Sequence, residues 1–528
     1  ISLCYNSFRM YWADKIAKTI IDSGKHKPYW ADDMKTPSGF AHIGSLRGPI
    51  IHSLIFRALK DAGQKANYTF VINDFDPLDG LSSELKDKYS QYLGFPLKKI
   101  PSPDANFKNL ADYYADDLIS TIRDLGAEAE ILSSWDMYHE GKFDGVIKEA
   151  LDSSEKIQDI YQKVSGSKKR EKGWLPFQVI CEKCGKLGTT RVYGWDGNAV
   201  SYKCEPSMVA WAKGCGHEGK ISPFGGIGKL PWKVDWAAHW KVIGVSIEGA
   251  GKDHASAGGS YDIAMTLCKE VFNYPQPFKL PYEFILIGGK KMSSSRGLGL
   301  KAHELTKILP SELGRFLFSR SDYREQVEFN PQDTMAIPDL FDEYDRCWQA
   351  FVDGSDEDIA RVFVLAQITK VPQKKTIFLP RFREVTQILQ MPNVNIKDYF
   401  KKKKGSDLTK EEENILEERI KYAKVWLEKF APAEAKFKVV TQTISAKAHI
   451  TFSKEFIAEL IEEIEKAKNP EELEKRLYEL IKKSGMPAKN AFSEIYTILI
   501  DKTHGPKAAW LIWENKEKAL EVFRKISK

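Results

Sequence analysis

The sequence predicts an α/β protein in which a parallel sheet is interrupted by a long insertion and followed by an all-helical region. Three observations support this prediction. An apolar strand pattern at Tyr68–Ile72 runs directly into acidic residues, as expected where parallel strands present groups to a ligand. Residues 81–230 are mixed and loop-rich, and they contain clustered cysteines. After residue 301 the apolar residues recur with helical spacing.

Composition limits the class of protein. The 528 residues allow three or four domains, and 42% hydrophobic with 29% charged residues is typical of a soluble protein. A net charge of +6 permits a nucleic-acid partner without requiring one. No apolar run is long enough to span a membrane, and residues 1–9 lack the features of a signal peptide, so the chain proper is expected to begin at Met10. Seven cysteines, an odd number, indicate a reducing, cytoplasmic compartment and a metal.

The first strand and the first glycine-rich stretch come early in the chain. Residues 28–35 are expected to form that strand, although Asp32 and Asp33 are unusual in a buried parallel strand. The segment 36–45, TPSGFAHIGS, then forms a turn before an apolar helix, whose free N–H groups and dipole suit phosphate. His42 adds a side-chain donor there, although a histidine at a helix start is more often a cap or core residue.

The second half of the sheet is expected to resume near Trp232, with strands at Val242–Val245 and Phe284–Ile287 and a helix at 260–272. A loop with the sequence IGGKKMSSSRG follows from Ile287. Its glycines, hydroxyls and basic side chains suit phosphate binding, whereas the alternative is a solvated basic surface loop. Within the insertion, helices are expected at 104–126 and 142–164.

Four cysteines in the insertion have the spacing of a metal site. Cys181 and Cys184 are separated by two residues, and Cys204 and Cys215 follow. Four thiolates satisfy the tetrahedral preference of zinc, so the pattern predicts a closed, structural zinc ribbon. Two alternatives remain: His217 could replace Cys215, or the cysteines could be unligated.

The C-terminal region has the signals of capped amphipathic helices. A helix is expected to open at 338–345, Thr409 and Glu412 form a capping-box pattern, and 456–464 has the period of a half-buried helix. The basic run 401–404 favours a solvated loop over an RNA contact.

Found together and in this order, the HIGS and KMSSS segments resemble the HIGH and KMSKS signatures of class I aminoacyl-tRNA synthetases. The surrounding sequence is most similar to the class I lysyl-tRNA synthetase family over nearly the whole chain. The matching segments are TPSG-x-x-HIG, DFDPL, the cysteine-bearing insertion, VDW-x-x-x-W, GKDH-x-x-x-GGSYD, KMSSS-x-G, LFDEYDR and the C-terminal GPK. The GKDH-x-x-x-GGSYD segment is the most specific to the lysine enzymes.

The resemblance implies a Rossmann-type sheet interrupted by a zinc-binding connective insertion and followed by an all-helical, α-helix-cage domain that binds the anticodon. The expected boundaries are 10–80 for the first half of the catalytic domain, 81–230 for the insertion, 231–300 for the second half, 301–340 for a stem-contact linker and 341–528 for the helical domain.

The activity implied is that of a lysine–tRNA ligase. Lysine is activated with ATP to lysyl-adenylate and then transferred to the terminal ribose of tRNA. Lysine, ATP and tRNA are the partners, ATP, Mg²⁺ and structural Zn²⁺ are the cofactors, and a cytoplasmic monomer without membrane contact is expected.

The family's functional residues fall on matching positions. Catalytic roles are implied for His42, Ser45 and Lys291. ATP binding is implied for Thr36, Gly39, His42, Gly44, Gly251, Asp253, Leu286, Ile287, Lys291, Ser293 and Ser294. Lysine binding is implied for Thr36, Asp74, Asp76, Trp240 and His254, with the acid least defined because Asp74 and Asp76 could instead cap a turn. Zinc binding is implied for Cys181, Cys184, Cys204 and Cys215.

Several positions depart from the family pattern and leave alternatives open. Met34 stands where the family has glycine, 103–106 lacks the family's Cys/His-type residues, Asp79 with Gly80 replaces an Arg-Lys pair, and Ser294 replaces the second lysine of KMSKS. One alternative is a class I synthetase for glutamate or cysteine, although Lys35 is the sole base near the first motif. Another is a tRNA-binding paralogue that has lost aminoacylation, suggested by Met34 and the acidic first strand.

Overall fold

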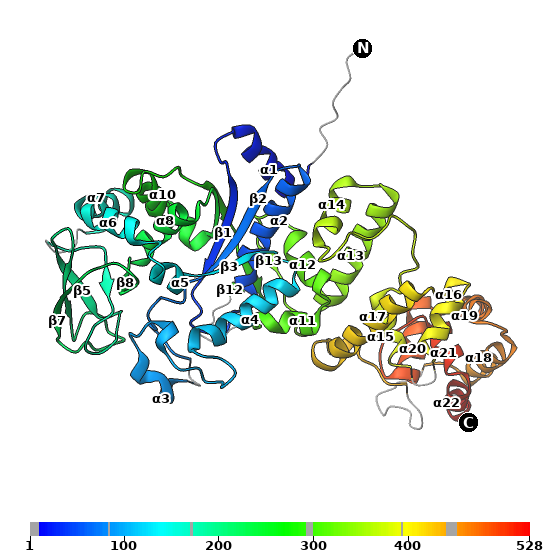
Figure 1. Cartoon of the computed structure of the whole chain (residues 1–528). Helices are drawn as coiled ribbons and strands as arrows, with labels where there is room; N and C mark the ends of the chain where they lie inside the picture. The colour runs from blue at the N-terminus through cyan, green and yellow to red at the C-terminus, as the bar shows by residue number, and fades with distance from the viewer. Residues whose placement is uncertain are drawn as a thin grey trace, which may run out of the picture. The chain divides into compact units, whose positions relative to one another are not determined.

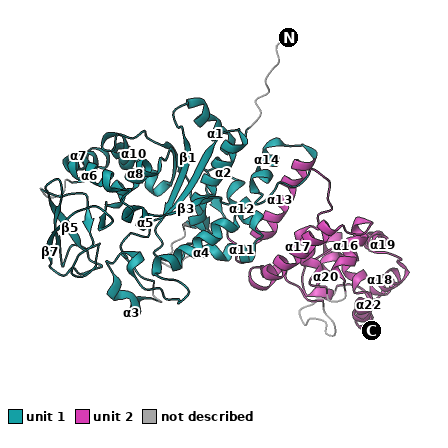
Figure 2. Cartoon of the chain, viewed as in Figure 1, with its two compact units in different colours: residues 1–329, 353–373 teal, residues 330–352, 374–528 magenta. Residues whose placement is uncertain are grey.

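The computed structural model describes residues 10–82, 85–168, 173–291, 299–391, 394–439 and 451–527. The chain divides into two compact units (Figure 2). The first combines residues up to 329 with 353–373, and the second combines 330–352 with 374–528.

The first unit is built on a five-stranded parallel sheet (Figure 1). Its order is β10-β9-β1-β2-β3, formed by β1 (Tyr29–Lys35), β2 (Ala66–Ile72), β3 (Glu130–Ser133), β9 (Ile247–Gly251) and β10 (Phe278–Tyr282). The predicted mixed α/β class, the parallel sheet and the first two strands are therefore confirmed. The central position of β1 places its two aspartates in the middle of the sheet.

Helices cover the sheet and pack its apolar side chains. They include α1 (Trp12–Ser23), α2 (Arg47–Asp61), α4 (Leu110–Asp124), α8 (Trp232–Ile243) and α10 (Ser260–Glu270). On α2, Ile50, Ile51 and Leu54 are fully buried, because this helix packs against α1, β1, β2 and β9. The helix expected at 260–272 is confirmed as α10.

Several predicted elements have different boundaries. The segment Val242–Val245 is not a strand: it contains the end of α8, which Gly244 terminates with a left-handed φ of 94°, and β9 begins only at Ile247. The helix expected at 142–164 is two helices, α6 (Asp144–Asp152) and α7 (Ser154–Ser165).

Two strands lie in unexpected sheets. β3 falls within the range assigned to the insertion, yet it pairs with β2 in the main sheet. β11 (Ile285–Ile287) forms the expected strand but belongs to a separate small sheet with β12 (Lys290–Lys291) and β13 (Val327–Glu328). Strands this short carry too little periodic pattern to be placed from sequence.

The insertion contains two small antiparallel sheets. One pairs β4 (Gln178–Val179) with β8 (Gly228–Lys229), and the other contains β5 (Thr190–Trp195), β6 (Val200–Cys204) and β7 (Glu218–Ile221). The remaining helices of the first unit are α3 (Lys86–Tyr89), α5 (Ser134–His139), α9 (Lys252–Ala255), α11 (Leu305–Ile308), α12 (Ser311–Ser319) and α14 (Glu357–Ala366).

The described part of the second unit is helical, as predicted. Its helices are α13 (Ala336–Asp353), α15 (Phe382–Ile388), α16 (Ile396–Lys404), α17 (Lys410–Lys429), α18 (Lys454–Lys466), α19 (Pro470–Ser484), α20 (Ala488–Ile500), α21 (Ala508–Glu514) and α22 (Lys516–Ser527). No helix in the described ranges is both long and apolar enough to cross a bilayer.

Local signals in the second unit are borne out with one exception. Thr409 and Glu412 form the predicted capping box at the start of α17. The basic run 401–404 is not a loop: it is the last turn of α16, closed by Gly405 at a φ of 82°. Lysines in this position favour the negative end of the helix dipole, which explains the run without an RNA contact.

Arg315 fixes the segment 353–373 to the first unit. Its guanidinium is buried and donates to the backbone oxygens of Leu365 at 2.7 Å, Leu125 at 3.0 Å and Gly126 at 3.3 Å. A fourth bond reaches the hydroxyl of Ser53 on α2 at 3.1 Å. One side chain thus joins α12, α14, α2 and the turn after α4.

Arg315→Met should destabilise the first unit strongly, because it leaves several buried carbonyls without a donor, each costing roughly 1–3 kcal/mol. Chemical denaturation would show a fall of at least about 3 kcal/mol in the free energy of unfolding. Lys307→Met, at an exposed position on α11, is the matched control and should change little. Equal stability of the two variants would contradict this role.

Candidate active site

A cavity of about 710 Å³ opens at the carboxyl ends of β1 and β9. The chain order reverses at β1, because β2 lies on one side of it and β9 on the other, and parallel α/β sheets bind ligands at such a point. Eight residues expected from the sequence line the cavity: Thr36, His42, Gly44, Ser45, Asp76, Gly251, Asp253 and His254.

The first glycine-rich stretch enters a helix at this cavity. His42 precedes a 3₁₀ turn, Ile43–Leu46, which continues directly into α2. A Cβ on Gly44 would lie 2.8 Å from the His42 ring and 3.2 Å from Ile285. Only glycine therefore fits between the histidine and β11, which keeps the helix start open to a ligand. Gly39 does not line the cavity, but its neighbour Ser38 does.

The second stretch is anchored beside the first at both ends. The N–H of Ile43 donates to the carbonyl of Leu300 at 3.0 Å, and the N–H of Ala302 donates to that of Ala41 at 2.7 Å. On the other side, the backbone of Lys291 pairs with Leu286 in β11. The Lys291 side chain, Ser293 and Ser294 lie outside the described residues, and Leu286 and Ile287 are half-buried on β11 without lining the cavity.

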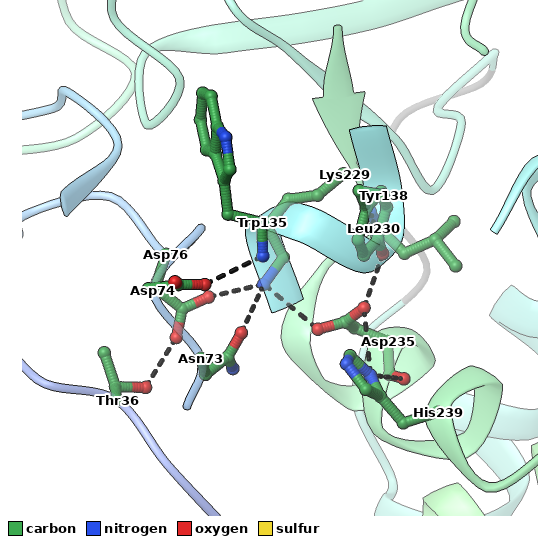
Figure 3. Close-up of polar contacts among 10 residues, drawn as sticks. All are labelled: Thr36, Asn73, Asp74, Asp76, Trp135, Tyr138, Lys229, Leu230, Asp235 and His239. Atoms are coloured by element: carbon green, nitrogen blue, oxygen red, sulfur yellow. Dashed lines mark hydrogen bonds and ion pairs between the residues drawn. The ribbon is translucent and has the colours of Figure 1, made fainter. Parts of the chain in front are cut away.

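A buried lysine organises the opposite wall (Figure 3). The ammonium of Lys229 contacts Asp76 at 2.6 Å, Asp235 at 3.0 Å and the side-chain oxygen of Asn73 at 3.1 Å. The second oxygen of Asp76 accepts from the hydroxyl of Thr36 at 2.6 Å. Asp76 lines the cavity, but both of its oxygens are engaged within the protein, which disfavours the predicted contact with a substrate ammonium.

The same cluster continues into the core through Asp235. Its carboxylate accepts from the hydroxyl of Tyr138 at 2.5 Å and lies 3.4 Å from Nδ1 of His239. Burial opposes ionisation, but the charge of Lys229 outweighs it and holds the pKa of Asp235 below its ordinary value. Burial likewise opposes a charged lysine, whereas the charges of Asp235 and Asp76 raise the pKa of Lys229.

Two other predicted lysine ligands lie away from the cavity. Asp74 is buried and accepts from the hydroxyl of Ser133 at 2.7 Å and from the N–H of Trp135 at 2.8 Å, and it pairs with Lys98 at 3.2 Å. This is the turn-capping role that the sequence left open. Trp240 is fully buried in the core and does not line the cavity.

The aromatic wall is formed by residues that the sequence analysis did not select. Trp236 and Trp232, one and two turns before Trp240 on α8, line the cavity with Tyr282. Trp232 packs edge-on against His254 with ring centres 5.5 Å apart. The i, i+4 spacing of tryptophans in VDW-x-x-x-W was the available signal, but sequence alone could not show which of them faces the cavity.

Asp33 and Glu248, two acids of the cavity lining, were also missed, as was Asp79. Asp33 accepts from the N–H of Met34 at 2.8 Å and lies 3.8 Å from Nδ1 of His52. Nε2 of that histidine accepts from the N–H of Gly249 at 2.8 Å, and its Nδ1 lies 2.8 Å from the carbonyl oxygen of Gly48. Burial raises the pKa values of both acids. Acids inside otherwise buried strands were the signal.

The four cysteines of the insertion converge. Their sulfur atoms all lie within 4.8 Å of one another, with Cys181 to Cys215 at 3.6 Å and Cys184 to Cys204 at 3.7 Å. Zinc–thiolate bonds of about 2.3 Å in a tetrahedron require sulfur separations of about 3.8 Å. The cluster therefore fits zinc with Cys215 as the fourth ligand. His217 lies outside this group.

Comparison with known proteins places the chain among related sequences. The family described as tRNA synthetases class I (K) matches residues 10–370. A lysine–tRNA ligase from Archaeoglobus fulgidus is 32% identical over 519 residues, covering 95% of this chain and 97% of the relative. Lysine–tRNA ligases from Methanosphaera stadtmanae and Methanocaldococcus jannaschii are 31% and 32% identical and cover 97% and 94% of this chain and 99% and 96% of their own lengths.

Lys229→Met should destabilise the first unit by about 3–5 kcal/mol at neutral pH, because it leaves Asp76 and Asp235 as buried charges without a cation. Lys220→Met is the matched control, since Lys220 pairs with Asp196 on the surface and such pairs contribute at most about 1 kcal/mol. Urea denaturation measures both. A loss no larger for Lys229→Met than for the control would show that the buried cluster does not hold the wall together.

Proposed function

Since the chain belongs to the class I tRNA synthetases of the lysine type, we propose that it is a lysine–tRNA ligase. It activates lysine with ATP and transfers the lysyl group from the adenylate to the terminal ribose of tRNA. The observation that supports this most directly is that the helix start at His42, Gly44 and Ser45 opens into a cavity with an aromatic and acidic wall, while β11, which leads into the second glycine-rich stretch, packs beside Gly44.

Activation needs positioning and charge stabilisation more than covalent catalysis. The lysine carboxylate attacks the α-phosphorus of ATP, and pyrophosphate leaves. His42 donates to the α-phosphate, and the helix start at Gly44 and Ser45 supplies backbone N–H groups and a favourable dipole. Lys291, with Lys290 and Arg296 in reserve, holds the leaving pyrophosphate, and bound Mg²⁺ would neutralise part of its charge.

The remaining roles follow from position. Asp253, two residues after the end of β9 and in the first turn of α9, accepts hydrogen bonds from the ribose hydroxyls. Gly251 leaves room beside it, since a Cβ there would lie 2.8 Å from the aspartate oxygen. The backbone of Leu286 and Ile287 contacts adenine. Gly39, Ser293 and Ser294 complete the phosphate-binding segments. Thr36 and His254 contact lysine, Asp76 holds Thr36 from within the cavity wall, and Asp74 and Trp240 act behind that wall.

The second unit is proposed to read the tRNA anticodon as an α-helix-cage domain, and the sheet of the first unit is of the Rossmann type. In this proposal the protein works as a cytoplasmic monomer. Met34 lines the cavity and packs against the core, and it is the residue that most directly raises the alternative of an inactive paralogue.

The experiment that tests the function is ATP–pyrophosphate exchange with each of the twenty amino acids, followed by charging of tRNA. Exchange that depends on lysine, together with lysyl-tRNA formation, supports the proposal. Exchange with glutamate or cysteine would identify another class I synthetase. tRNA binding without exchange would identify a paralogue that has lost activation.

His42→Ala should lower the rate of adenylate formation by about 10²–10³, because a donor to the developing charge is lost. Affinity for tRNA should change little, since tRNA contacts extend over a large area. His504→Ala, an exposed histidine of the second unit, is the control and should exchange normally. A His42→Ala enzyme with near-normal exchange would refute the assignment.

The cysteine cluster is proposed to hold one structural Zn²⁺. Purified protein should contain about one zinc per chain, and Cys184→Ser should lose most of it and weaken the insertion. Cys268→Ser, a buried cysteine of α10 outside the cluster, should keep the zinc. Elemental analysis measures both variants. Wild-type protein without zinc, or a Cys184→Ser variant that retains it, would contradict the proposed zinc site.

A further inference from the structure

The cysteine cluster and the candidate active site share one loop. Residues 205–214 connect Cys204 to Cys215, so both ends of this loop are fixed at the cluster. The structure describes the whole loop, and it contains no helix or strand. Trp211 lies within it and lines the cavity of the candidate active site. The position of this side chain therefore depends on the two cysteines and on what the loop packs against.

Trp211 packs against the segment that carries Asp76. A Cβ on Gly188 would overlap the Trp211 ring and would lie 3.3 Å from the Cβ of Pro77, so the three residues meet at one point. Only glycine leaves room for the indole there. Pro77 directly follows Asp76, whose carboxylate pairs with Lys229 at 2.6 Å. The Trp211 ring thus supports the cavity wall from the side of the insertion.

The backbone just after the first two cysteines is hydrogen-bonded to the loop after β2. The N–H groups of Leu187 and Gly188 donate to the carbonyl of Gly94 at 2.7 Å and 3.1 Å. The N–H of Gly94 donates in turn to the carbonyl of Leu78 at 2.9 Å, and the N–H of Leu78 donates to the carbonyl of Phe95 at 2.9 Å. These bonds connect the cysteine-bearing turn to the loop after β2.

The cysteine cluster is connected to the other half of the wall through β4. Cys181 comes two residues after the end of β4, and Gln178 in that strand pairs with Lys229 in β8. Gln178 and Lys229 both line the cavity. The cluster is therefore linked by short backbone segments to both partners of the ion pair between Lys229 and Asp76.

We propose that the metal ion held by the four cysteines fixes the substrate cavity, and that Trp211 is the positioning residue through which it acts. This inference rests on the proposed function, because it uses the zinc site and the lysine site assigned there. The physical reason is that metal binding supplies folding energy to segments with little core of their own. When the ends of loop 205–214 are fixed, the indole holds Pro77 in place, and Asp76 with it.

A wall that is ordered before the substrate arrives binds it more tightly, because the ordering entropy is no longer lost on binding. Thr36, which is proposed to contact lysine, is held by Asp76 in this wall. Coupling of this kind is reciprocal, so bound lysine must raise the affinity for zinc by the same factor as zinc raises the affinity for lysine. Coupling between two sites typically amounts to about 5–150-fold.

Hydrogen–deuterium exchange without any substrate tests the connection itself. Trp211→Leu keeps all four cysteines, so it should bind about one zinc per chain and protect residues 181–188 as the wild type does. Amides in residues 73–79 should exchange at least about 5-fold faster in this variant, as they should in wild-type protein stripped of zinc by a chelator. Tyr193→Leu, at an exposed position on β5 of the same insertion, is the control and should exchange as the wild type.

A second measurement uses the reciprocity of the coupling. Zinc affinity is determined by competition with a chromophoric chelator, with and without saturating lysine. Lysine should raise the zinc affinity of the wild type by about 5–150-fold and that of Trp211→Leu by much less. KM for lysine in pyrophosphate exchange should rise in Trp211→Leu by the factor that is lost.

The outcomes separate this inference from the proposed function. A wild-type enzyme that does not activate lysine contradicts the function, whereas the exchange experiment, which contains no substrate, still decides the role of Trp211. Unchanged protection of residues 73–79 in zinc-loaded Trp211→Leu, or zinc affinity that lysine does not alter in an enzyme that activates lysine, contradicts the inference alone. If Trp211→Leu does not fold, Gly188→Ala displaces the indole with an added methyl group and gives the same test. Wild-type protein without zinc contradicts both the zinc site and this inference.

Discussion

The ion cluster around Lys229 is the interaction on which the cavity wall depends. Lys229 comes from β8 in the insertion, Asp76 from the loop after β2 and Asp235 from α8, so one ammonium joins three segments far apart in the sequence. A lysine buried in this way is stable only because two carboxylates and an amide oxygen surround it. Asp76 also accepts a hydrogen bond from Thr36, so the cluster holds that residue in place. Asp235 belongs to the same helix, α8, as Trp232 and Trp236, so the cluster fixes these two side chains as well.

The contacts of this cluster and its surroundings also distinguish the acids that are engaged within the protein from those that are not. Asp74 and Asp76 follow β2 and were the natural candidates for binding a cationic substrate. Both are used by the protein itself, Asp74 at the start of α5 and Asp76 at Lys229. Asp33 and Glu248 lie within the strands, and neither forms an ion pair with a lysine or arginine in the described part of the chain.

The fold and the phosphate side of the site could largely be predicted from sequence, because they depend on local patterns. Each of these structures is determined by a few neighbouring residues: the capping box at Thr409, the strand at Tyr68 and the helix start beside His42. The four cysteines were also selected correctly as a group, since metal-ligand spacing is a local property.

The substrate side of the cavity depends on contacts between distant segments, and there sequence reasoning was less accurate. Which tryptophan of α8 faces the cavity is set by the rotation of the helix against α10, and Trp240 turned out to be core. The end of α8 was mistaken for a strand because Val242, Ile243 and Val245 are β-branched, and β propensity cannot outweigh helix packing closed by Gly244.

The acidic first strand is another place where sequence reasoning was limited. Two aspartates in a central parallel strand argue against a buried strand when propensity alone is considered. In the structure, Asp32 accepts from the hydroxyl of Thr69 at 2.5 Å on the neighbouring strand, and Asp33 lines the cavity 3.8 Å from Nδ1 of His52. One oxygen of Asp32 is therefore bound within the sheet, whereas its second oxygen has no hydrogen-bond partner among the described residues. These acids break the apolar pattern expected of a buried parallel strand at the point where the cavity opens, so the local exception to the folding rule coincides with the candidate site.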